Sequence, residues 1–314
     1  MKNWIPAIFL LLTALPLHAW HIVGGSMSYQ FLGNDTYRIR LEIYRDCAQT
    51  VGAPFDNPAS IGIFDENNFL VLELQVPYDD NTNDTISLLP DNFVCEFPAN
   101  ICIHRATYEV DVTLPPGTGK YTVTYQRCCR SLVIANLLAP ETIGMTFTAE
   151  IDPDHPNSSP IFNQDIPLAI FANIAFVYDG SAADPDGDSL AYKLSTPLAG
   201  ADQTIPQPIP PPAPPYLPVT FAPNYAEDNM LGGNYPLKID PATGEFTAVA
   251  PSLGAFQIGY KVEEYRNGQL IGSTQREFLF VVTQPQPTLN FDVSGRVLID
   301  SLAPLDAGTV QLLK

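Results

Sequence analysis

A two-residue alternation of apolar and polar side chains is the feature that most constrains the fold of this chain. In residues 36–46, Tyr37, Ile39, Leu41 and Ile43 share one face, and charged residues occupy the other. This period is typical of a strand with one buried face. The same pattern recurs in residues 69–76, 107–114, 121–129 and 143–151.

Turn residues separate these segments, and no long helical periodicity interrupts them. The chain has 31 prolines among its 314 residues, and proline is unfavourable inside helices and central strands. We therefore predict an all-β fold of tandem β-sandwich domains. The expected organisation is a domain at 20–152, a second at 157–283, a linker at 284–288 and the start of a truncated third β-sandwich domain at 289–314.

The second domain has its own strand and turn signals. A hairpin is predicted at residues 240–245, where Gly244 can adopt positive φ. The proline-rich residues 205–218 are either a ligand for a polyproline-binding domain or a stiff connection, and we favour the connection. Strands are expected at residues 167–178, 189–195, 219–222, 236–239, 255–265 and 276–282.

Residues 1–19 have the layout of a secretory signal peptide. Lys2 precedes an apolar run, and Ala19 supplies a small residue at the expected cleavage position. The run is shorter than the roughly 20 residues of a membrane-spanning helix. We expect a secreted or cell-surface protein that begins near Trp20 and has no membrane span in the mature chain.

The net charge of −19 narrows the choice of partners. Such an acidic chain repels phosphate groups, so nucleic acid is not an expected partner. The charge is compatible with calcium, and also with solubility alone.

Five cysteines precede residue 130, and export makes disulfides the expected state. The odd number leaves one thiol over, and sequence alone leaves the pairing open. Neighbouring residues of a strand face opposite ways, so Cys128 and Cys129 are expected to have different partners. The candidates are Cys47, Cys95, Cys102, Cys128 and Cys129.

The strongest local motif is the acidic turn Asp184-Pro185-Asp186-Gly187-Asp188. Alternate aspartates can direct several oxygens at one Ca²⁺ ion, and Asp179 is close enough in sequence to join them. A turn capped by its own side chains accounts for the motif equally well. The sequence shows no paired-cysteine or His-Glu-x-x-His metal motif and no nucleophile elbow, so we expect no enzymatic activity.

Several motifs, in this order, resemble the N-terminal region of large Bacteroidota surface proteins that are labelled gliding-motility-associated or type IX secretion substrates. The resemblance implies export and a long multidomain architecture, with a cadherin-like or immunoglobulin-like second module. The motifs are His21-Ile22-Val23-Gly24-Gly25, Tyr44-Arg45-Asp46-Cys47, Tyr125-Gln126-Arg127-Cys128-Cys129-Arg130, the acidic turn 184–190 and Glu264-Tyr265-Arg266-Asn267-Gly268.

Two functions fit these observations. The first is a non-enzymatic structural or adhesion module that binds an extracellular protein or a glycan surface ligand. The second is the accessory N-terminal part of a secreted enzyme or carbohydrate-binding protein.

Overall fold

The computed structural model describes residues 22–47, 54–78, 84–85, 102–115, 119–165 and 169–284. The signal segment, Cys95, the linker after residue 284 and the expected third domain lie outside these residues. Among the described residues, no helix has the length and apolar composition needed to cross a membrane. The secondary structure in them is almost entirely β, which confirms the predicted all-β class.

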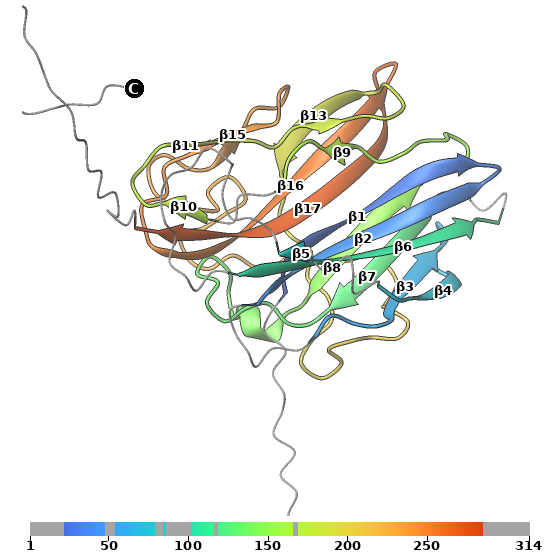
Figure 1. Cartoon of the computed structure of the whole chain (residues 1–314), viewed down its shortest axis with the longest axis horizontal. Coiled ribbons are helices and arrows are strands. Elements are labelled where there is room, and N and C mark those ends of the chain that lie inside the picture. The colour runs from blue at the N-terminus through green and yellow to red at the C-terminus, as the bar shows by residue number, and fades with distance from the viewer. Residues whose placement is uncertain are drawn as a thin grey trace, which may run out of the picture.

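The first half of the chain forms a two-layered sandwich (Figure 1). One layer has the strand order β1–β2–β6–β5, and the other has the order β4–β3–β7–β8. The apolar faces of both layers meet in one core, to which β2 contributes the four residues that alternation predicted. The strands are β1 (Ile22–Gly33), β2 (Thr36–Asp46), β3 (Ala59–Phe64), β4 (Leu70–Val76), β5 (Asp84–Thr85), β6 (Ile103–Thr113), β7 (Tyr121–Arg127) and β8 (Met145–Ile151).

The second half is built around a long hairpin of β16 and β17. Short strands pack against it and enclose a second core rich in aromatic side chains, including Phe246, Tyr260 and Phe278. The strands are β9 (Ile161–Phe162), β10 (Ala169–Phe171), β11 (Phe176–Asp179), β12 (Ala182–Ala183), β13 (Ser189–Leu194), β14 (Lys238–Ile239), β15 (Glu245–Ala248), β16 (Gly254–Arg266) and β17 (Gln269–Thr283).

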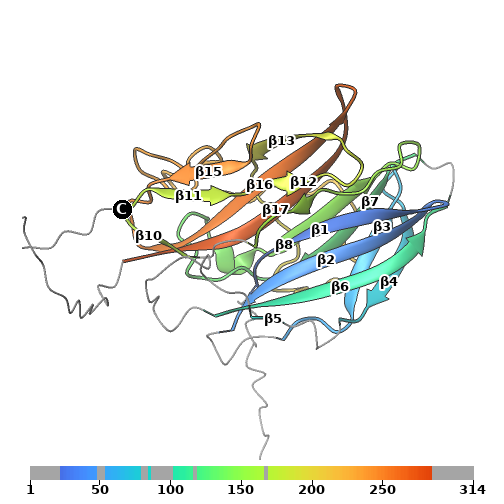
Figure 2. The ribbon, with the colours of Figure 1, turned by 45° about the horizontal axis from the view of Figure 1, so that its top comes forward.

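Strand β17 joins the two halves. It pairs with β16 along its length, with β1 at Gly25 and Ser26, and with β8 through Thr274 opposite Ala149. Within the described residues, twelve strands consequently form one continuous sheet. The described part of the chain does not form clearly separate tandem sandwiches: it has two hydrophobic cores, but one sheet continues from one to the other through β17 (Figure 2).

Two adjacent glycines, Gly24 and Gly25, allow β1 to lie close to the backbones of β17 and β2. A Cβ atom on Gly24 would lie 2.2 Å from the carbonyl oxygen of Glu277 in β17. A Cβ atom on Gly25 would lie 2.4 Å from the carbonyl oxygen of Glu42 and 2.9 Å from the ring of Phe147. The Gly24-Gly25 pair thus has a steric role, because any side chain would push these strands apart.

A buried ion pair crosses the same junction. The guanidinium of Arg130 is fully buried and donates to both carboxylate oxygens of Glu277, at 3.1 and 3.3 Å. It also donates to the carbonyl oxygens of Gly144 and Leu198. These acceptors come from both halves, so one side chain satisfies polar groups on either side of the junction.

Two loop segments, one after β8 and one between β13 and β14, are also bonded to the first sandwich. The hydroxyls of Ser158 and Ser159 accept hydrogen bonds from the backbone of Phe31 and Tyr29, so the segment after β8 covers the free edge of β1. In the proline-rich segment, Tyr216 donates to Thr124 on β7, and the carbonyl of Pro206 accepts from Cys128. This segment connects strands, as expected, and it also packs on the first half.

Most predicted strands are present, and the differences are local. Residues 167–178 contain two strands, β10 and β11, because Asn173 has a positive φ of 59° and interrupts the extended chain. Residues 219–222 form no strand; Phe221 makes an isolated bridge with the loop residue Leu137. The hairpin at residues 240–245 is confirmed: β14 pairs with β15, and Gly244 has a φ of 74°.

Glu277→Ala is expected to lower the free energy of unfolding by about 3–5 kcal/mol, because it leaves the buried charge of Arg130 without its partner. Denaturant unfolding measures this change. The matched control is Glu150→Ala, which breaks the Lys120–Glu150 pair, half exposed on both sides, and should cost less than about 1 kcal/mol. Equal losses in the two variants would show that the buried pair does not hold the junction.

Candidate functional site

The acidic turn lies between β12 and β13, and it brings three carboxylates together. One oxygen each of Asp184, Asp186 and Asp188 lies within 4.8 Å of the others. The Oδ1 atom of Asp184 accepts the backbone N–H groups of Asp186 and Asp188 at 2.9 and 2.8 Å, and Gly187 has a φ of 83°. These contacts are those of an aspartate-capped turn.

The other two aspartates reach residues far away in sequence. Asp186 accepts the backbone N–H of Ser158 at 2.6 Å. Asp188, whose side chain is only 4% exposed, forms a two-bond pair with Arg266 at 2.7 and 2.8 Å. Arg266 also donates to Asn157 at 2.9 Å. The structure thus joins the acidic turn to the 264–268 motif and to the start of the second half.

Glu264 is the most perturbed group of the cluster, and sequence reasoning missed it as a site residue. Its side chain is fully buried, and Oε1 accepts a 2.6 Å hydrogen bond from Asn157. Its Oε2 has no hydrogen-bond partner, and neither has Oδ2 of Asp184. Burial, and then the charges of Asp184, Asp188 and Asp186, raise the pKa of Glu264 to about 8 despite the bond from Asn157.

Asp179 does not join this cluster, which corrects one predicted ligand. It ends β11, where it pairs with Glu245 of β15, and its carboxylate accepts the backbone N–H of Ser181 at 3.0 Å. The turn at Gly180 and Ser181 and the short strand β12 separate it from the other aspartates. Closeness in sequence therefore did not translate into closeness in space.

The donor set fits calcium in part. Calcium takes six to eight oxygen ligands, and this turn offers three carboxylates. Oδ2 of Asp184 and Oε2 of nearby Glu264 are buried and have no hydrogen-bond partner. The Asp188 carboxylate is already neutralised by Arg266. The aspartate-capped turn explains the occupied oxygens, whereas it leaves Oδ2 of Asp184 and Oε2 of Glu264 unexplained.

The disulfide between Cys47 and Cys102 closes the end of the β2–β6 ladder. It follows directly on the register pair of Asp46 and Ile103, and the N–H of Cys47 donates to the carbonyl of Cys102 at 2.7 Å. His104 lies beside these sulfur atoms. Because both cysteines are in the disulfide, they are not available as thiolate metal ligands.

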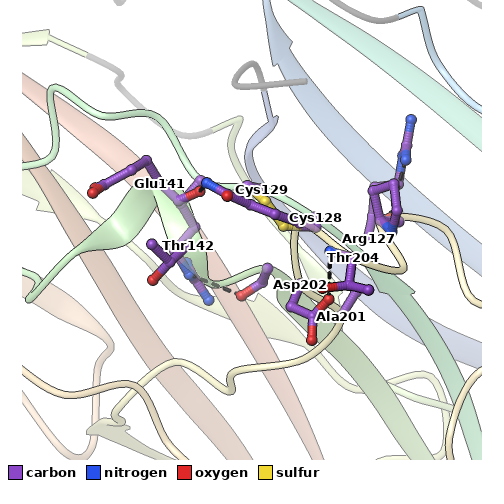
Figure 3. Close-up of a disulfide and its surroundings, with 12 residues drawn as sticks. Arg127, Cys128, Cys129, Glu141, Thr142, Ala201, Asp202 and Thr204 are labelled. Atoms are coloured by element: carbon purple, nitrogen blue, oxygen red, sulfur yellow. Dashed lines mark hydrogen bonds between the residues drawn. A yellow bond between two sulfur atoms is a disulfide. The ribbon is translucent and has the colours of Figure 1, made fainter. Parts of the chain in front are cut away.

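Cys128 and Cys129 form a disulfide with each other, contrary to the expectation that they have different partners (Figure 3). The expectation assumed strand alternation, but β7 ends at Arg127, and both cysteines lie beyond it. Both are buried. Next to them, Arg127 donates to the carbonyl of Pro206, so this disulfide lies where the end of β7 meets a loop of the second half.

No family model, curated protein or solved structure matches this chain. The assignment of a function therefore depends on the sequence pattern and on the geometry described above.

Glu264→Gln is expected to remove a decline in stability between about pH 5 and pH 8. The folded pKa is raised, so the stabilising contribution of the neutral form is complete below about pH 4.5 and is lost as the pH rises through about 8. The loss in the wild-type chain is on the order of a few kcal/mol. Urea unfolding across this range, with a chelator present, measures the difference between the two proteins.

The control is Glu263→Gln on the neighbouring position. Burial raises the pKa of Glu263, but the hydrogen bonds and charges of Lys193, Tyr265 and Lys261 outweigh it, so the folded pKa is lowered. Its stabilising contribution is therefore present above its unfolded pKa and lost at lower pH, and the decline above pH 5 should persist. Parallel curves for wild type and Glu264→Gln would contradict the assignment.

Proposed function

We propose that this chain is an exported, non-enzymatic structural or adhesion module at the cell surface, belonging to a longer multidomain protein. The observation that carries the proposal is the junction at β17, where a shared sheet and the buried Arg130–Glu277 pair join the two cores. Such a junction resists bending between the halves, and it would therefore hold a binding surface at a fixed distance from the point of attachment.

The disulfides support the extracellular part of the proposal. The Cys47–Cys102 bond closes a loop of 55 residues in sequence separation, and such bonds persist in oxidising compartments. The acidic composition and the signal-peptide pattern favour the same location. A role in gliding motility rests on the sequence resemblance.

The direction of the strands is compatible with presentation away from the cell. The β16–β17 turn at Asn267-Gly268 and the end of β17 lie at opposite ends of the long hairpin (Figure 1). The turn between β1 and β2 lies toward the end that carries the β16–β17 turn. In our proposal the chain is attached through the segment after β17, and the end with the turns is directed outward.

The proposal includes a calcium ion at the acidic turn, where it would add stiffness. Two observations support it: the three carboxylates within 4.8 Å, and the buried, unpartnered oxygens of Asp184 and Glu264. A divalent cation would relieve the repulsion among these groups. Since the ligands assemble only in the folded chain, binding would be measured as stability.

Surface exposure and adhesion are tested in cells of the source organism. Antibodies against this chain should label intact cells, N-terminal sequencing of the labelled protein should begin near Trp20, and deletion of residues 22–284 should reduce attachment of cells to a substratum. Labelling that requires lysis would contradict export. Unchanged attachment after the deletion would contradict an adhesive role.

Calcium should raise the melting temperature of the chain above the values measured in magnesium and in chelator. At a calcium concentration one hundred times the dissociation constant, the free energy of unfolding should rise by about 2.7 kcal/mol. Asp184→Asn should abolish the rise, since asparagine keeps an oxygen for the two backbone N–H groups and loses the open one. Asp240→Asn is the matched control, because Asp240 caps a similar turn at Ala242 and Thr243. Equal melting in all three conditions, or a rise that survives Asp184→Asn, would exclude the site.

A further inference from the structure

A polar cleft of about 640 Å³ lies where the outer face of the first sandwich meets the segment that leads into the second half. Its floor is the solvent-facing side of β1, β2 and β6, which lie side by side in Figure 2. Its wall is formed by residues 158–165, with Pro185 of the acidic turn at its edge. This volume is within the range of small-molecule sites.

The floor is a ladder of cross-strand pairs. Ser28 of β1 is opposite Arg40 of β2, which is opposite Glu109 of β6. Arg40 donates to Glu109 at 2.9 Å and to Glu42 at 2.7 Å. In the next row, Arg38 donates to both carboxylate oxygens of Asp111, at 2.7 and 3.0 Å. These contacts favour one arrangement of side chains that are nearly half exposed.

The wall is attached to the first sandwich at both of its ends. The Ser158 and Ser159 hydroxyls anchor its first part to the backbone of β1, and Arg105 of β6 pairs with Asp165 at its far end, at 2.8 Å. Between these anchors, the buried guanidinium of Arg276 lies 4.5 Å from the centre of the Phe162 ring. An ordinary solvated sheet face has no such wall. The cleft therefore results from the packing of residues 158–165 on the outer face of the first sandwich.

The charges of the cleft nearly cancel, in contrast to the chain as a whole. Four arginines and three carboxylates line it, giving a net charge of +1 in a chain of net charge −19. Asp111, which pairs with Arg38, completes the balance. An anionic ligand would have to compete with carboxylates that the arginines already bind, and a cationic ligand would have to compete with the arginines.

A neutral hydroxyl group does not have to displace either the carboxylates or the arginines from their ion pairs. Each guanidinium has five N–H donors and each carboxylate about four acceptor positions, so the pairs on the floor retain donors and acceptors after binding one another. A hydroxyl can accept from an arginine and donate to the neighbouring carboxylate at once. Because the ion pairs already hold the side chains in place, binding costs less conformational entropy.

The edge of the cleft supplies the apolar surface that a sugar ring requires. Ile161 is 65% exposed, Pro185 is also exposed, and both line the cleft. The C–H face of a pyranose ring can pack on such a surface while its hydroxyls turn toward the floor. We propose that this cleft binds a neutral oligosaccharide, which deepens the adhesive role and depends on the proposed function of the chain.

The test is a binding screen of the exported chain against immobilised neutral oligosaccharides from glucans, mannans, xylans and galactans, together with uronate-bearing and sulfated counterparts. Neutral oligosaccharides should bind best. Ser28→Trp, which fills the cleft from its floor, and Arg40→Gln, which breaks the ladder, should each lower the affinity at least tenfold. Lys120→Gln, in an exposed pair away from the cleft, should leave it unchanged.

Melting curves establish that the variants are folded, and Arg40→Gln decides the outcome where Ser28→Trp does not fold. Binding that survives both cleft variants, a preference for acidic glycans, or no binding to any neutral member of the panel would overturn the proposal. In cells, loss of attachment on deletion of residues 22–284 but full attachment with Ser28→Trp would refute the cleft and leave the adhesive role intact. Loss with both changes would support both proposals.

Discussion

The Arg130–Glu277 pair is the interaction on which the rest of the structure depends. A charge in a dry interior is tolerated only when it is paired and its remaining donors are satisfied. Arg130 meets this requirement with three acceptors: Glu277 of β17, the carbonyl oxygen of Gly144 just before β8, and the carbonyl oxygen of Leu198. Separating the two halves would leave the charge of Arg130 without its partner. This energetic cost opposes a change in the relative position of the halves.

The other side chains of the Tyr125–Arg130 motif have related roles. Tyr125 donates to the buried carboxylate of Asp56, and Arg127 pairs with the same group at 3.0 Å. Gln126 accepts the backbone N–H of Ala201 at 3.1 Å. This short motif therefore ties β7 both to the interior of its own sandwich and to the second half, which gives its unusual density of polar residues a physical reason.

The parts of the fold that the sequence predicted are those that depend on neighbours along the chain. Alternation in residues 36–46 located β2 because one of its faces is buried and the other is solvated. In β17 both faces are covered, so the neighbouring charged residues Arg276 and Glu277 are both buried although their side chains face opposite ways. The pairing of β17 with β1 joins residues about 250 positions apart, and no local pattern contains that contact. For the same reason the turn predicted the three clustered aspartates but neither Glu264 nor Asn157.

The acidic turn and the polar cleft belong to one network through the segment that connects the halves. Asn157 bonds to Glu264 and to Arg266, and the N–H of Ser158 donates to Asp186, while the hydroxyl of the same serine holds the cleft wall on β1. Pro185, between two of the aspartates, lines the cleft. Ser158 therefore contacts the acidic turn through its N–H and β1 through its hydroxyl. A displacement of this one residue would disturb both hydrogen bonds, so the geometry of the acidic turn and that of the cleft wall depend on the same segment.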